Sequence, residues 1–147
     1  MSTISQFFSG GNRAPIAIVN AFSSGTPAGV SIVRQNALEI LSGAVTSGVL
    51  KTVLSHTGAG CLKNLYVYTK DGTARTLRLK VTLDGTSVFD STSASISANG
   101  NGIVAVGPVQ DTAGDRVFYN ASLTVEIASS ISETDKIAIG VVRETYS

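Results

Sequence analysis

The most reactive side chains in this sequence are its one histidine, His56, and its one cysteine, Cys61, which flank the turn-forming run Gly58-Ala59-Gly60. A structural zinc site needs four ligands, and this pair supplies only two, so the spacing argues against a zinc centre. His56 has no Gly-x-Ser-x-Gly motif to activate, which argues against a hydrolase. A single cysteine gives no disulfide framework within the chain. We therefore predict no metal site and no nucleophilic catalysis.

The other candidates for chemistry have simpler structural explanations. Asp84 and Asp90 flank a predicted hairpin, where Asp84 suits the turn and Asp90 the solvated end of a strand. The glycines at 58 and 60 lack the third glycine of a dinucleotide-binding loop. Asn120-Ala121-Ser122 matches a glycosylation sequon, but the sequence shows no secretory signal that would expose it to that modification. We predict no catalytic residue, no cofactor and no small-molecule substrate.

The tyrosines leave two interpretations open. Tyr66, Tyr68, Tyr119 and Tyr146 either line a sugar-binding face or serve as amphipathic residues at the edge of a core. Burial of these side chains would weaken the first interpretation.

Any such site has to be positioned by strands, and residues 60–91 give the firmest strand prediction. Here Leu77, Leu79, Val81 and Leu83 alternate with Thr76, Arg78, Lys80 and Thr82. Successive strand side chains point to opposite faces, so we expect one buried face and one wet face carrying Arg78 and Lys80. Asp84-Gly85 predicts a two-residue type I′ hairpin. Together with residues 61–69 and a turn at 70–72, the pattern predicts three consecutive antiparallel strands.

Apolar runs of strand length recur through the rest of the chain. They cover residues 49–54, a weak edge strand at 93–97, residues 103–106, one long strand or a bent pair at 117–120 and 123–127, and residues 137–142. A short helix over 34–41 is an alternative, although the Ser and Thr residues that follow favour a strand. Eight to nine strands separated by turn residues are typical of a β-sandwich or jelly roll. We predict an all-β, antiparallel, jelly-roll-like domain at residues 28–147.

Charge is sparse and unevenly distributed. Of the 147 residues, 14% are charged and the formal net charge is +1, which argues against a nucleic-acid or anionic membrane partner. No apolar run approaches the ~20 residues that span a bilayer. Residues 51–80 are mainly basic and residues 84–147 mainly acidic. In a monomer the two halves face each other or the solvent, whereas in an oligomer they steer one subunit against another.

Residues 1–27 are the least regular part of the chain. They hold the apolar residues Ile4, Phe7 and Phe8, a glycine pair, and one short predicted strand at 16–22. Large apolar side chains are out of place on a free tail, so we expect an extended arm that docks on a neighbouring chain or on its own domain. Without a signal peptide, synthesis in a cytoplasm is expected.

Two stretches resemble small virion structural proteins of tailed bacteriophages. One runs through residues 48–55, 58–62, 76–85 and 88–90, and the other is the opening Met1-Ser2-Thr3-Ile4-Ser5-Gln6-Phe7-Phe8 with the glycines after it. Within that class, compact jelly rolls of this length resemble capsid decoration (cement or minor capsid) proteins. The resemblance implies a homotrimer on the outside of a phage head, bound to the major capsid protein, and it carries over no functional residues.

Three functional hypotheses follow. The first is a non-enzymatic capsid decoration protein, made in the host bacterial cytoplasm and located in the virion, with interfaces at Ile4, Phe7 and Phe8 and on the face of Arg78 and Lys80. The second is a tail or tail-fibre component that binds a host glycan or receptor. The third is an enzyme or an unrelated cellular β-sandwich, which a cleft holding His56 with a carboxylate would favour.

Overall fold

The computed structural model describes residues 32–106 and 117–147, with side chains from residue 39 onward, and the secondary-structure elements in these residues are all β-strands. The strands are β1 (Ile32–Leu41), β2 (Ala44–Val45), β3 (Lys51–Thr57), β4 (Gly60–Thr69), β5 (Leu77–Leu83), β6 (Thr86–Thr92), β7 (Gly102–Val106), β8 (Val117–Tyr119), β9 (Ser122–Ser129), β10 (Glu133–Thr134) and β11 (Ile137–Tyr146). No helix occurs in these residues, so none is present that is long and apolar enough to cross a membrane.

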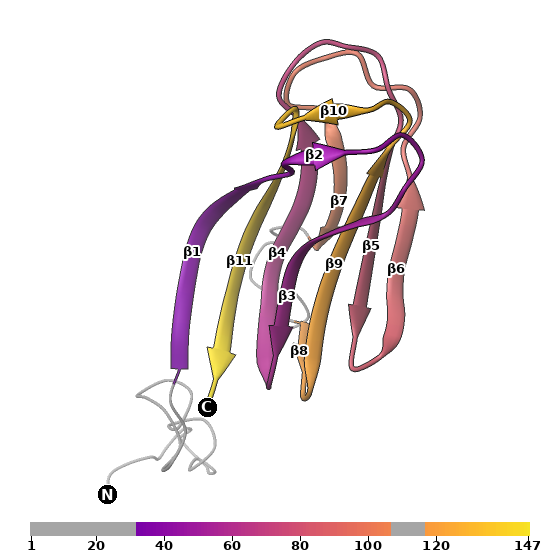
Figure 1. The fold of residues 1–147 in the computed structure, drawn as a ribbon. Coiled ribbons are helices and arrows are strands. Elements are labelled where there is room, and N and C mark those ends of the chain that lie inside the picture. Colours follow the sequence, from indigo (N-terminus) through magenta and orange to yellow (C-terminus); the bar gives the residue numbers. More distant parts are fainter. Residues whose placement is uncertain (1–31, 107–116) are drawn as a thin grey trace, which may run out of the picture. The chain divides into compact units, whose positions relative to one another are not determined.

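A five-stranded and a four-stranded sheet make up the body of the domain (Figure 1). One sheet has the order β1-β11-β4-β7, with β8 also paired to β4, and the other has the order β3-β9-β5-β6. The pairings are nested: β5 with β6, β4 with β7, β3 with β9, and β1 beside β11. This is the strand order of an eight-stranded jelly roll, which follows from one long antiparallel ribbon wrapped into two sheets. The predicted all-β, jelly-roll-like class is confirmed.

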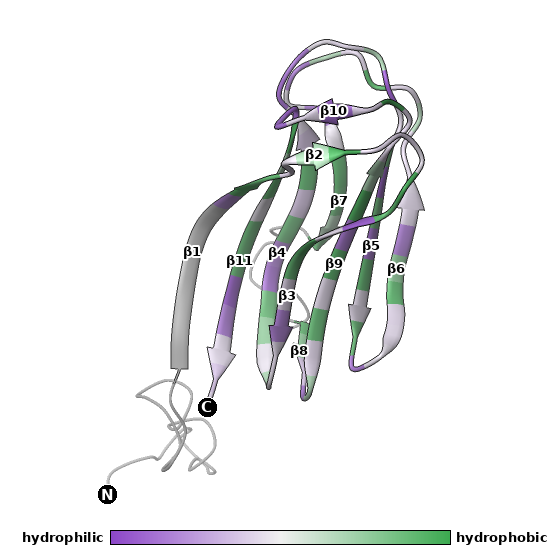
Figure 2. Cartoon of the chain, viewed as in Figure 1, coloured by the Kyte–Doolittle hydropathy of each residue, from purple (hydrophilic) through white to green (hydrophobic). Residues whose placement is uncertain are grey.

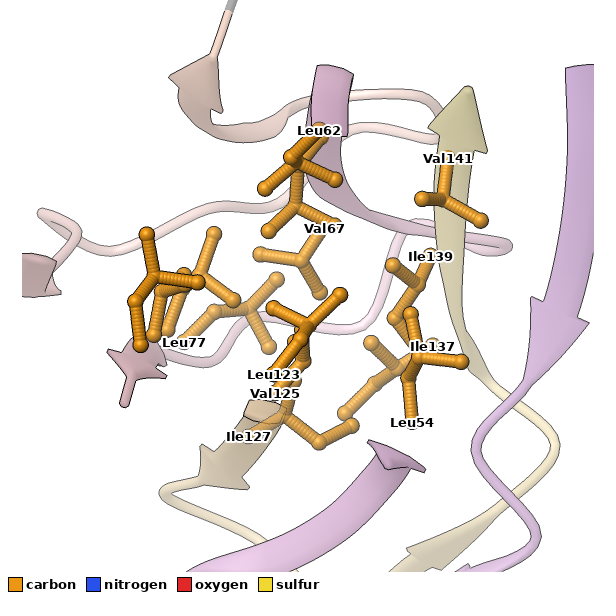
Figure 3. Close-up of a cluster of buried hydrophobic side chains, with 14 of the residues drawn as sticks. Leu54, Leu62, Val67, Leu77, Leu123, Val125, Ile127, Ile137, Ile139 and Val141 are labelled. Carbon is orange, nitrogen blue, oxygen red and sulfur yellow. The ribbon is translucent and has the colours of Figure 1, made fainter. Parts of the chain in front are cut away.

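The core lies between the two sheets. Leu77, Leu79, Val81 and Leu83 of β5 are buried, whereas Arg78 and Lys80 lie on the outer face of the same strand, as the alternation predicted. Leu123, Val125 and Ile127 of the neighbouring strand β9 extend this buried face, and Ile137 and Ile139 of β11 belong to the opposite sheet (Figure 3). The alternation is visible as successive bands of different hydropathy along β5 and β9 (Figure 2).

The hairpin between β5 and β6 has the predicted turn. Asp84 and Gly85 have φ angles of 49° and 83°, and positive φ at both positions is what a type I′ turn requires. The Asp84 carboxylate also accepts hydrogen bonds from the backbone N–H groups of Asn120, Ala121 and Ser122, at 2.6 to 3.1 Å. These bonds hold the pKa of Asp84 below its usual value. One residue therefore fixes both the hairpin and the bend between β8 and β9.

Several sequence predictions need correction. The strands at 60–91 are not one three-stranded unit, because β4 lies in one sheet and β5 and β6 in the other. Residues 93–97 form only an isolated bridge from Ile96 to Arg75, not an edge strand. Residues 34–41 belong to strand β1, so the helical alternative is wrong. The bent pair at 117–127 is confirmed as β8 and β9, which belong to different sheets. Glu133–Thr134 form the short strand β10, which the sequence analysis did not predict.

The predicted arm, residues 1–27 with Ile4, Phe7 and Phe8, lies outside the described residues, as does the strand expected at 16–22.

Candidate interaction surfaces

The outer face of the β3-β9-β5-β6 sheet carries the predicted interface residues Arg78 and Lys80. Arg78 donates two hydrogen bonds of 2.7 Å, from Nε and Nη2, to the two carboxylate oxygens of Asp90 on β6. Lys80 Nζ lies 3.7 Å from Glu126 on β9. Bonding to Arg78 holds the pKa of Asp90 below its usual value, and the same bond raises the pKa of Arg78. Asp90 is therefore an ion-pair partner and not merely a solvated strand end.

The basic and acidic halves of the sequence meet across strands of the same chain. Besides the two pairs on this sheet, Lys63 bonds Glu144 at 2.7 Å and Arg75 lies 3.0 Å from Glu133. The charge distribution left two alternatives open, contacts within a monomer or between subunits. These ion pairs are the contacts within one chain that were expected of a monomer. The role of Arg78 and Lys80 in contacts with another chain stays a prediction.

The outer face of the other sheet holds a pair of stacked aromatic rings. Tyr66 and Tyr68 on β4 have ring centroids 5.3 Å apart and planes inclined by 25°. The Tyr68 hydroxyl donates to Glu39 of β1, and this bond raises the pKa of Tyr68 to about 12. The ammonium of Lys70 bonds the same carboxylate and lies 5.9 Å from the Tyr68 ring centroid.

The four tyrosines named from the sequence do not form one face. Tyr119 is buried, with 1% of its surface exposed, and Tyr146 is the last residue of β11. Only Tyr66 and Tyr68 are neighbours on an outer face, with Tyr66 38% exposed. The sugar-binding interpretation is therefore reduced to this pair.

His56 lies near one end of the sandwich, against Tyr119 of β8. The Tyr119 hydroxyl is 3.1 Å from Nδ1 of His56, and the two rings meet edge to face with centroids 5.7 Å apart. Gly60 makes room for that hydroxyl, because a Cβ there would lie 2.3 Å from it. Burial, and then the charge of Arg143, lowers the pKa of His56. In the part of the chain that the structure describes, the polar partner of His56 is the Tyr119 hydroxyl, and no carboxylate is bonded to the imidazole.

This environment predicts a loss of stability as the pH falls. The folded-state pKa of His56 lies below its unfolded value, so the unfolded chain binds the proton more readily. The contribution is fully present above the unfolded pKa, about 6.5, and is lost as the pH falls through the folded-state pKa. We expect the urea midpoint to be lower at pH 5 than at pH 7.5.

The control is His56→Gln, since His56 is the one histidine of the sequence. The difference between the two midpoints should shrink in this variant. An equal difference in wild type and variant would show that other groups cause the pH dependence.

A buried arginine that the sequence analysis did not single out ties together the opposite end of the sandwich. Arg75 is 3% exposed and bonds the Asp71 carboxylate through Nη2 at 2.5 Å. Its Nε lies 3.0 Å from Glu133 Oε2 without hydrogen-bond geometry, so that contact is electrostatic. Glu133 in turn accepts a 2.5 Å hydrogen bond from Ser129. Arg75 thereby links the β4–β5 connection to the segment between β9 and β11.

The described residues contain no group of three or more His, Cys, Asp or Glu side chains that would hold a metal ion. Cys61 is buried and forms no disulfide.

The sequence matches no family model and no curated protein. Among solved structures, the chain is similar to a virus-like particle of the extra small virus of the giant freshwater prawn Macrobrachium rosenbergii, with 12% identity, a TM-score of 0.47, and coverage of 81% of this chain and 80% of that one. It is also similar to infectious bursal disease virus, Gt strain, with 16% identity, a TM-score of 0.35, and coverage of 80% and 32%. The VP2 subviral particle of the same virus gives 16% identity, a TM-score of 0.36, and coverage of 80% and 32%. The chain thus spans about a third of the length of the last two, and at these TM-scores none of the likenesses bears on function.

Proposed function

We propose that this chain is a non-enzymatic virion structural protein that binds the outside of a tailed-bacteriophage head as a decoration, or cement, protein. In this role it forms a homotrimer, contacts the major capsid protein where capsomers meet, and stabilises their contacts against the pressure of packaged DNA. It is made in the host bacterial cytoplasm and resides in the virion.

The observation that supports this proposal is the complete jelly-roll order of the eight long strands. Double-sheet jelly rolls recur in viral capsid proteins, lectins and cupins. A cupin-type metal centre needs a cluster of ligands, and the described residues offer none. The fold supports the class of virion structural protein by analogy, and the position on a phage head rests on the sequence resemblance.

The contact surfaces follow from the same reasoning. Residues 1–27 act as the docking arm of the domain at 28–147, with Ile4, Phe7 and Phe8 as its apolar anchors. Burial of two phenylalanine side chains stabilises an interface by roughly 3–6 kcal/mol, enough to offset the ordering of a few residues. The paired charges of Arg78 and Lys80 form a polar contact face. On a threefold site a trimer repeats each weak contact, and linked contacts gain through effective concentration.

The test is rebinding to phage heads from which the protein has been stripped. We expect a trimeric mass by light scattering and recovery of bound protein on the heads. A variant without residues 1–12 should keep its strand circular dichroism and unfolding midpoint but bind more weakly.

Monomeric behaviour with no rebinding would overturn the proposal. Density for this chain only on the tail would favour the tail or tail-fibre alternative. Unchanged rebinding by the truncated variant would remove the role of the arm alone.

A further inference from the structure

Two small residues of β11, Ala138 and Gly140, leave room for the rings of Tyr66 and Tyr68 on the outer face of the β1-β11-β4-β7 sheet. We call these four residues the tyrosine shelf. The strand register places Gly140 opposite Tyr66 and Ala138 opposite Tyr68. A Cβ at Gly140 would lie 2.4 Å from Cζ of Tyr66, so the ring occupies the space that a side chain there would fill. Tyr66 therefore lies across the backbone of β11 and does not project freely into solvent.

Polar contacts hold the ring of Tyr68 in place, and the ring of Tyr66 is held by stacking on it. The Glu39 carboxylate accepts hydrogen bonds from the Tyr68 hydroxyl and the Lys70 ammonium. Glu39 lies on β1, on the other side of β11 from β4, so these bonds fix Tyr68 across β11. Tyr66 stacks on this fixed ring. Tyrosine has few rotatable bonds, so a ring already held in place loses little entropy when a ligand covers it. The arrangement is preorganised for contact.

The exposed surface of the shelf is amphipathic. Tyr66 is 38% exposed, and Val104 of β7, its cross-strand partner, is 59% exposed. The Glu39 carboxylate and the Lys70 ammonium, both partly exposed, supply a hydrogen-bond acceptor and donors beside the rings. We propose that Tyr66, Tyr68, Glu39 and Lys70 form a binding site for a saccharide, whose apolar ring face covers Tyr66 and whose hydroxyl groups reach the charged pair.

Other ligand classes fit this surface less well. Single-stranded nucleic acid also stacks on aromatic rings, but it needs a positively charged groove, and Lys70 is neutralised by Glu39. A stable protein interface needs about 800 Å² from each partner, far more than two rings supply. A saccharide matches both the size and the mixture of apolar and polar groups. The assignment does not depend on the proposed capsid role, so either can fail alone.

The test uses the full chain and the resonances of the Tyr66 ring. Maltotriose, chitotriose and mannotriose are titrated in turn while the tyrosine ring signals are followed by NMR, with a thymidine decamer as the nucleic-acid probe. We expect at least one trisaccharide to shift the Tyr66 signals in a saturable way. Tyr66→Ala should weaken that binding roughly tenfold or more, whereas Tyr66→Phe, which keeps the ring, should retain most of it.

Val88→Ala is the matched control, because Val88 is 53% exposed but lies on β6 of the other sheet. It should bind as the wild type does. The proposal is overturned if none of the three trisaccharides shifts the Tyr66 signals, if only the decamer does so, or if Tyr66→Ala binds with unchanged affinity. Should Tyr66→Ala fail to fold, the wild-type titration alone decides.

Discussion

Replacing Arg75 with alanine is expected to lower the free energy of unfolding by roughly 3–5 kcal/mol, because the substitution leaves the buried carboxylate of Glu133 without its cation. The side chains of Arg75 and Glu133 are 1% and 5% exposed, so water does not replace the lost contact. Urea unfolding followed by circular dichroism measures the change.

Two further variants separate burial from charge. Arg78→Ala removes an arginine of β5 whose ion pair with Asp90 is largely exposed. Its effect on the unfolding midpoint should be far smaller than that of Arg75→Ala. In the double variant Arg75→Met with Glu133→Leu no buried charge is left unpaired, so we expect it to recover much of the loss. An Arg75→Ala midpoint equal to that of Arg78→Ala would contradict the buried network.

The sequence predicted the local features of the fold well. Strict alternation in β5 identified its buried face, and Asp84-Gly85 identified its turn, because both signals lie within a few consecutive residues. The expectation of three consecutive antiparallel strands at 60–91 did not anticipate that β4 and β5 belong to different sheets. Alternation shows that a run is a strand with one buried face, but in a two-sheet fold it does not show which sheet the strand joins.

The candidate surfaces were harder to predict. Arg75 was counted as one of many basic residues, and its burial arises only when segments some 60 residues apart meet at one end of the sandwich. The tyrosine shelf had a signal in the spacing of Tyr66 and Tyr68, which places both on one face of a strand. The small residues Ala138 and Gly140 that accommodate them became relevant only once the register of β4 and β11 was known.

The second large effect is expected in the middle of the core, at Leu79. This residue is fully buried on β5, between Ile127 of β9 and Ser91 of β6 in the strand register. Leu79→Ala should lower the free energy of unfolding by roughly 2–5 kcal/mol, through lost burial and the cavity left behind.

The cavity has little chance to close by movement of β5. A shift of one residue would turn Arg78 and Lys80 into the core, at a cost of several kcal/mol, so the strand is held in register and the void persists. We therefore expect a loss toward the upper end of the range. Lys80→Ala, one residue along on the outer face, is the matched control and should change the unfolding midpoint far less. Equal losses in the two variants would mean that β5 has no single buried face, and the jelly-roll register would then have to be reassigned from this strand outward.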